Sequence, residues 1–107
     1  MVSLQKADRR KHPRYPLSTG VQFHHCASRH DFPARSVDIS DTGVLMYVPM
    51  TAPVQAGQMV KLTMGAIKSP RFASMSETPV EGRIVRVERQ GLLTAGNLMV
   101  GVEFARA

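Results

Sequence analysis

The chain has 107 residues, of which 43% are hydrophobic, so it is long enough for one domain with a modest core and too apolar to remain disordered. The net charge of +6 favours an anionic partner such as a nucleic acid, a nucleotide or a membrane surface. The single cysteine, Cys26, excludes an internal disulfide and fits a reducing compartment. No apolar run approaches the length of a membrane span, and no apolar block follows the N-terminal charges, so we expect a cytoplasmic protein without a signal peptide.

The N-terminal segment is strongly basic. Five of the first fourteen residues are Lys or Arg, and Arg9, Arg10 and Arg14 lie within six positions. Arginine carries a planar fork of donors that suits phosphate oxygens and the edge of guanine. Pro13 disfavours a helix and pushes the residue before it toward an extended conformation. We expect residues 1–16 to form a flexible basic arm, for which composition alone leaves an ordinary solvated tail as the alternative.

The rest of the chain, residues 17–107, has the pattern of a β-protein. Apolar residues alternate with polar ones in short segments separated by turn residues, and no window has a convincing helical period. The six strands are expected at 19–26, 34–39, 44–48, 59–64, 80–87 and 98–104. Together they predict one all-β domain, a small antiparallel barrel or sandwich.

Some details of these strands depend on strict alternation of side chains. Val37 and Ile39 are expected to share one face of the second strand. In the fifth strand, Gly82, Ile84 and Arg86 are expected to share one face. The connection at 27–33 is expected to be a polar hairpin loop, and the segment 65–79 a long polar loop.

A group of possible metal ligands occurs early in the chain: His24, His25, Cys26 and His30. In a strand, His24 and Cys26 would face one side and His25 the other, and the second paired set of ligands that zinc sites use is missing. We therefore expect no metal site and no cofactor, and interpret these residues as a strand end that leads into a polar loop.

The sequence Asp38-Ile39-Ser40-Asp41-Thr42-Gly43 is a compact polar turn between two expected strands. Asp and Ser side chains readily bond nearby backbone amides, and Gly43 can adopt a positive φ. An ordinary tight hairpin explains Gly43 well and Ser40 adequately. It does not explain why Asp38 should lie inside a strand.

Two motifs, taken together, resemble a known family. Arg10 and Arg14 form Arg-x-x-x-Arg, and Asp38, Ser40 and Gly43 form Asp-x-Ser-x-x-Gly. In this order, on a chain of six expected strands, they are similar to the PilZ domains, bacterial receptors for the second messenger cyclic di-GMP. The resemblance covers most of the chain, up to the closing strand at 101–104, and implies a six-stranded antiparallel barrel of the split-barrel type.

The resemblance also implies roles for individual residues. Arg9, Arg10 and Arg14 would contact phosphate and the guanine O6 and N7 atoms. Asp38 would accept hydrogen bonds from guanine N1 and N2, and Ser40 would bond phosphate or backbone. Gly43 would allow close approach to the barrel. Binding would order the arm and pass a signal to a protein partner in motility, exopolysaccharide or virulence control.

The chain departs from the family pattern at two places. Where some members stack an aromatic side chain on a guanine, this sequence has Arg86, which is expected to take that role by stacking its guanidinium. The C-terminal helix that often follows the last strand is expected to be short, absent or part of a longer parent chain. The same reading leaves open whether one ligand or an intercalated pair binds and whether the protein is a monomer or a weak dimer.

Two other functions compete with a cyclic di-GMP receptor. The first is a basic barrel that binds nucleic acid through the same arm, but the usual stacking aromatics are few near the arm, where only Tyr15 and Phe23 occur. The second is a degenerate domain that binds only a protein partner. No nucleophile and base stand out as a pair, so we expect no enzyme activity.

Overall fold

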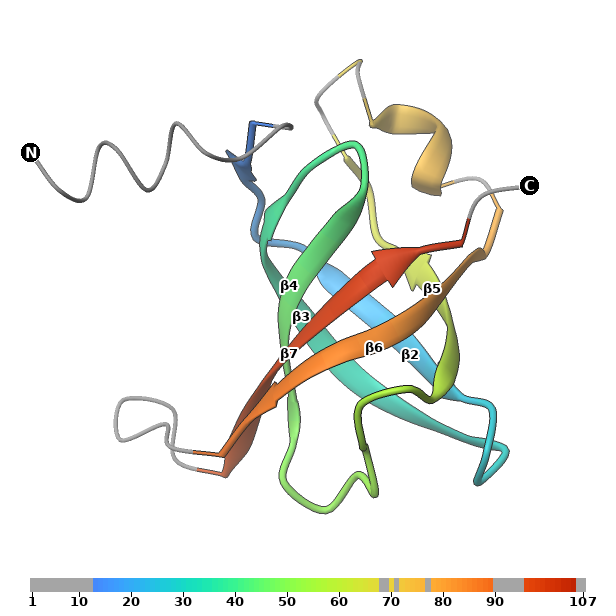
Figure 1. The fold of residues 1–107 in the computed structure, drawn as a ribbon. Coiled ribbons are helices and arrows are strands. Elements are labelled where there is room, and N and C mark those ends of the chain that lie inside the picture. Colours follow the sequence, from blue (N-terminus) through green and yellow to red (C-terminus); the bar gives the residue numbers. More distant parts are fainter. Residues whose placement is uncertain (1–12, 68–69, 71, 77, 90–95, 106–107) are drawn as a thin grey trace, which may run out of the picture.

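The computed structural model describes residues 13–67, 70, 72–76, 78–89 and 96–105. Over these residues the chain forms seven β-strands and one turn of 3-10 helix, η1 (Figure 1). Their bounds are β1 Tyr15–Pro16, β2 Gly20–His25, β3 His30–Ile39, β4 Gly43–Pro49, β5 Met59–Met64, η1 Ala73–Ser76, β6 Val80–Glu88 and β7 Asn97–Phe104. No helix among the described residues is long and apolar enough to cross a membrane.

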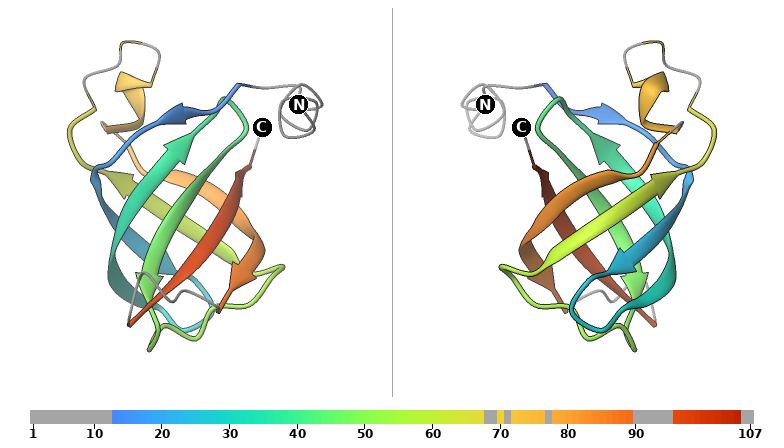
Figure 2. Two further views of the ribbon diagram at one scale, coloured as in Figure 1. Left: turned by 90° about the vertical axis from the view of Figure 1, so that its left-hand side faces the viewer. Right: turned by 90° about the vertical axis from the view of Figure 1, so that its right-hand side faces the viewer.

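Six of the strands close into an antiparallel barrel. The hydrogen-bonded order is β3-β2-β5-β6-β7-β4, and pairing between β4 and β3 closes the ring (Figure 2). The seventh strand, β1, has only two residues and pairs with the end of β3 on the edge opposite β4, with Tyr15 opposite Ile39 and Pro16 opposite Asp38. The predicted six-stranded barrel is therefore confirmed, and β1 additionally fixes the base of the arm next to Asp38.

The core fills the barrel with aliphatic, methionine and phenylalanine side chains. Alternation is regular in β5, where Val60, Leu62 and Met64 point inward while their neighbours are exposed. The segment expected to be only a long polar loop also contributes, because Ile67 and Phe72 are buried and Phe72 packs on the Tyr15 ring with centroids 5.7 Å apart. The structure thus corrects that expectation: two apolar residues anchor this segment to the core.

The hairpin between β2 and β3 is tighter than the sequence suggested. We expected a loop over 27–33, but β3 already begins at His30. Arg29 has a positive φ of 63°, and its N–H donates to the His25 carbonyl at 2.8 Å, which closes the turn. The expected loop ended at Pro33, which lies within β3. This proline lies in the part of β3 that pairs only with β2, where the missing N–H of a proline is tolerated.

Two β-bulges change which side chains face outward. One lies between Ser36 and Asp38 in β3. Consequently Ser36 and Ile39 are buried, and the expectation that Val37 shares the face of Ile39 is wrong.

The second bulge lies between Ile84 and Arg86 in β6. Gly82 and Ile84 are buried, whereas Val85 and Arg86 are both exposed. The expected common face of Ile84 and Arg86 is therefore also wrong, because the extra residue turns Arg86 outward.

Candidate functional site

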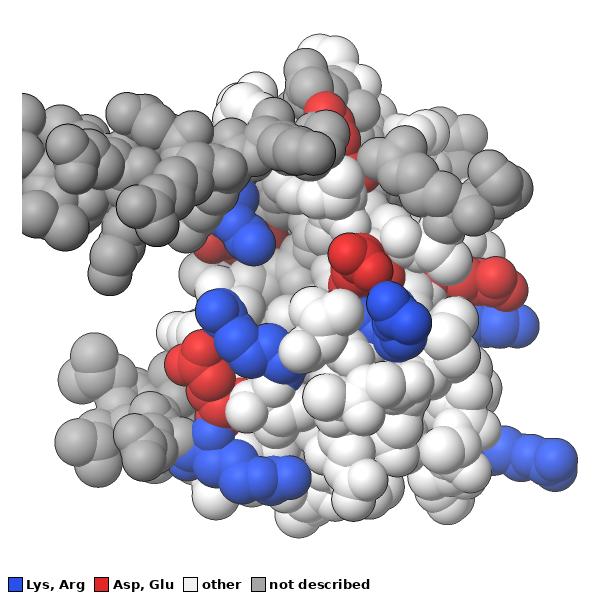
Figure 3. Space-filling view, in the orientation of Figure 1, with Lys and Arg blue, Asp and Glu red and all other residues white. Residues whose placement is uncertain are grey.

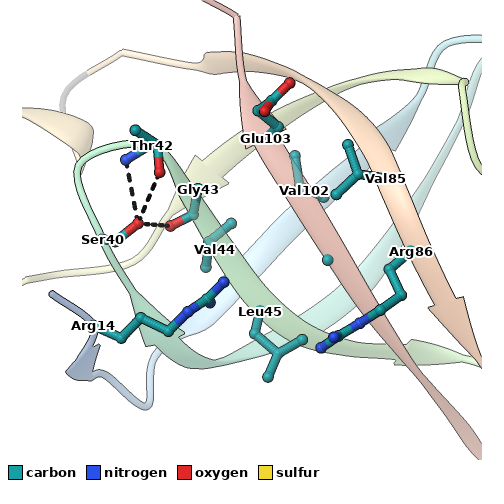
Figure 4. A pocket seen from close by; sticks show the side chains of 11 residues that line it. Arg14, Ser40, Thr42, Gly43, Val44, Leu45, Val85, Arg86, Val102 and Glu103 are labelled. Atoms are coloured by element: carbon teal, nitrogen blue, oxygen red, sulfur yellow. Dashed lines mark hydrogen bonds between the residues drawn. The ribbon is translucent and has the colours of Figure 1, made fainter. Parts of the chain in front are cut away.

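A pocket of about 280 Å³ opens on the outside of the barrel, over β4, β6 and β7. Of the seven residues expected to bind a ligand, four line it: Arg14, Ser40, Gly43 and Arg86. Figure 4 shows the guanidinium groups of Arg14 and Arg86 extending toward each other from opposite sides, with Leu45 between them. Asp38 adjoins the pocket through Arg14, and Arg9 and Arg10 lie outside the described residues.

Arg14 is held in place by Asp38. Its Nη1 atom donates to Asp38 Oδ1 at 3.0 Å, and the two side chains are 38% and 24% exposed. The contact follows from the fold, since β1 begins one residue after Arg14 and places Pro16 opposite Asp38. A guanidinium has five N–H donors, so one bond to a carboxylate leaves capacity for an anion in the pocket.

Ser40 forms the turn between β3 and β4. Its N–H donates to the Gly43 carbonyl at 2.8 Å, and its hydroxyl accepts the Thr42 N–H at 3.2 Å. The hydroxyl also lies 3.2 Å from Thr42 Oγ1, and the residue is only 3% exposed. The Ser40 hydroxyl thus contacts the backbone of its own turn.

Gly43 is required by a close approach of strands. A Cβ atom at this position would lie 2.4 Å from the Val102 carbonyl oxygen of β7, where Gly43 pairs with Glu103. Gly43 does not use the positive φ that a glycine can adopt, since the positive-φ glycines among the described residues are Gly57 and Gly96. Any side chain at 43 would force β4 away from β7 at the rim of the pocket.

Arg86 reaches the pocket because of the bulge in β6. Its Nε atom forms an ion pair with Glu88 Oε2 at 3.0 Å, and both side chains are about half exposed. On β7, Glu103 also lines the pocket and pairs with Arg83 at 3.3 Å. Figure 3 shows acidic and basic side chains alternating over this face rather than one continuous basic patch. A ligand anion must therefore compete with carboxylates for these arginines.

Several lining residues were not found from the sequence: Thr42, Val44, Leu45, Val85, Gly101, Val102 and Glu103. They come together because β7 lies between β4 and β6, so that Gly101 is opposite Leu45 on one side and Arg86 on the other. The available signal was Gly101, a glycine inside an alternating strand. Its neighbours depend on strand register, which the sequence does not specify.

The histidines do not form a metal site within the described residues. His24 Nδ1 lies 2.6 Å from Asp31 Oδ1 on the exposed face of the β2–β3 hairpin. His25 is buried, and its two ring nitrogens contact Ser28 Oγ and Gln58 Oε1, both at 2.7 Å. The hydrogen bond from His24, followed by that from Gln22, lowers the pKa of Asp31 below its ordinary value.

The sequence matches the PilZ domain family over residues 8–107, and no curated protein matches it. Among solved structures, the chain is similar to the Bacillus subtilis inhibitor of motility (MotI/DgrA), with a TM-score of 0.66 and 15% identity over 92% of this chain and 43% of that chain. It is also similar to the PilZ domain of YcgR from Escherichia coli, a structure with c-di-GMP, with a TM-score of 0.62 and 15% identity over 92% of this chain and 79% of that chain. The chain thus spans less than half the length of the motility inhibitor.

Proposed function

Because the chain belongs to the PilZ domain family, we propose that it is a cyclic di-GMP receptor module that catalyses no reaction. One observation carries the proposal. Arg14 and Arg86 line a single pocket together with Ser40 and Gly43 of the β3–β4 turn, and Asp38 forms an ion pair with Arg14. The motif residues are far apart in the chain, and the fold gathers them at one place. The determination of the YcgR PilZ domain with c-di-GMP supports the choice of ligand.

The chemistry of the pocket suits this ligand. Cyclic di-GMP carries two phosphates and two guanines, and arginine forks bind both phosphate oxygens and the O6 and N7 acceptors of guanine. Asp38 accepts hydrogen bonds from guanine N1 and N2. Gly43 lets the ligand approach the backbone, and Arg86 stacks its planar guanidinium on a base. Ser40 maintains the turn through its bonds to Thr42 and Gly43.

The arm completes the site in this proposal. Arg9 and Arg10 precede Arg14, and β1 fixes the base of the arm beside Asp38. When the ligand binds, Arg9 and Arg10 fold over it and contact phosphate and guanine. The ordered arm then presents a new surface to a protein partner in the cytoplasm. The structural similarity to a motility inhibitor favours motility as the process controlled.

Titration calorimetry with cyclic di-GMP tests the proposal. We expect a dissociation constant in the low micromolar range or below, a binding free energy of about 8 kcal/mol or more. The stoichiometry distinguishes one ligand from an intercalated pair. Absence of binding by the intact protein would contradict the receptor function. Affinity for DNA or RNA that exceeds that for cyclic di-GMP and falls steeply with salt would instead favour the nucleic-acid alternative.

A further inference from the structure

Gly101 lies in the middle of the pocket floor. It belongs to β7, between the buried residues Val100 and Val102, so its outward side faces the pocket. It pairs with Leu45 of β4 on one side and with Arg86 of β6 on the other. The position therefore has a strand on each side and is open to the outside of the barrel.

The fold does not explain why this residue is a glycine. A Cβ atom at 101 would lie 3.6 Å from Arg86 Cβ and 3.9 Å from Val85 Cγ2, which are ordinary contacts. By comparison, a Cβ at Gly43 or Gly82 would lie within about 2.5 Å of β7 atoms. Gly101 is also not among the described glycines with positive φ. Glycine inside a strand weakens it, so the barrel would tolerate a larger residue here and gain stability from it.

The surroundings of Gly101 have the properties of a stacking surface. Val85, the extra residue of the β6 bulge, is 51% exposed although it is apolar. Leu45 also lines the pocket, and Arg86 supplies a planar cation beside the same floor. A bare strand backbone between two aliphatic side chains and a guanidinium offers a flat, partly apolar contact to an aromatic ring.

We propose that one guanine ring of the ligand binds at Gly101. The ring lies flat on the backbone between Leu45 and Val85, with the Arg86 guanidinium against it. This inference rests on the proposed cyclic di-GMP function and extends it to a residue outside the two motifs. The glycine at 101 thus lowers the stability of the strand but leaves space for the base. A side chain at 101 would fill that room.

Substitutions at Gly101 separate this role from a structural one. Gly101→Val should weaken cyclic di-GMP binding by about tenfold or more, and Gly101→Ala by about two- to fivefold, because the side chain occupies the place of the base. Both variants should unfold at the wild-type temperature or up to about 6 °C above it. The matched controls are Gly20→Ala and Gly20→Val. Gly20 lies in β2 and does not line the pocket, and a Cβ atom there would meet no other atom within 4 Å. These controls should bind within about twofold of wild type.

The outcomes that contradict the inference are distinct from those that contradict the receptor function. If the wild-type protein binds cyclic di-GMP and Gly101→Val binds it equally well, the guanine ring does not bind at Gly101. A melting temperature lowered in both Gly101 variants would show that the fold itself requires the glycine. If wild-type protein does not bind cyclic di-GMP at all, the receptor function fails, and this role of Gly101 fails with it.

Discussion

Two regions of the barrel hold their polar side chains in different ways. On the β2–β3 hairpin, His24 lies directly opposite Asp31, and both carboxylate oxygens of Asp31 are bonded, one to His24 and one to Gln22. Around the pocket, bulges interrupt β3 and β6, and Arg14 and Arg86 each contact a single carboxylate oxygen within the described residues. Regular register lets polar neighbours satisfy one another, whereas the bulge in β6 turns the Arg86 side chain toward an open pocket. Bulges are common beside functional sites for this reason.

The largest expected effect concerns the close approach of strands at the rim of the pocket. Gly43→Ala places a Cβ atom 2.4 Å from the Val102 carbonyl, so β4 and β7 must separate. We expect a loss of about 1–3 kcal/mol in the free energy of unfolding. Chemical denaturation measures it, with Gly20→Ala as the control that leaves stability unchanged or slightly raised. Wild-type stability of Gly43→Ala would show that the strands are free to move apart here.

The second prediction concerns the ion pair between Arg14 and Asp38 at the pocket. Arg14→Ala and Asp38→Ala should each weaken cyclic di-GMP binding by about tenfold or more, because the proposed site uses both side chains to contact the ligand. Calorimetry measures the change, with Lys61→Ala as the control. Lys61 is an exposed basic residue of β5 that does not line the pocket, so its loss changes the net charge equally to that of Arg14. Equal losses with Arg14→Ala and Lys61→Ala would indicate non-specific charge attraction.

A smaller effect concerns Glu88, the carboxylate that pairs with Arg86 beside the pocket. Glu88 forms an ion pair with Arg86, and its negative charge repels an anionic ligand at the pocket. Glu88→Gln should therefore tighten cyclic di-GMP binding by about two- to fivefold, the range expected for a solvent-exposed ion pair. Glu81→Gln is the matched control, since Glu81 is an exposed acid of the same strand and does not line the pocket. Weaker binding by Glu88→Gln would mean that Glu88 positions Arg86 instead of competing for it.

The smallest effect lies in the hairpin. The pKa of Asp31 is lowered in the folded state, first by the His24 hydrogen bond, so its contribution to stability is present above the unfolded pKa of about 4 and is lost as the pH falls through the folded value. Asp31→Asn should be less stable than wild type at pH 6, and the difference should shrink toward pH values of about 3 and below. Thermal unfolding across this range measures it. A difference that stays constant with pH would contradict the ionic contribution.

The sequence allowed the barrel and one half of the site to be predicted. Alternation identified the strands, and the two motifs identified Arg14, Asp38, Ser40 and Gly43 as neighbours. Alternation assumes unbroken strands, however, so the bulge that exposes Arg86 could not be seen.

The remaining floor of the pocket depends on which strands pair and in what register. Gly101 and Leu45 are distant in sequence and meet only because β7 lies beside β4. The expected loop at 27–33 also included Pro33, which lies instead in a segment of β3 that pairs with β2 and not with β4. These features are properties of the assembled sheet and not of any local stretch of sequence.

The central claim is that the pocket over β4, β6 and β7 binds cyclic di-GMP, and mapping of backbone amide shifts by NMR during a titration tests it most directly. We predict saturable shifts at Thr42, Leu45 and Gly101, which line the pocket, and unchanged shifts at His24 and Asp31 in the hairpin. Shifts concentrated on the hairpin, or no shifts at a ligand concentration well above micromolar, would contradict the account.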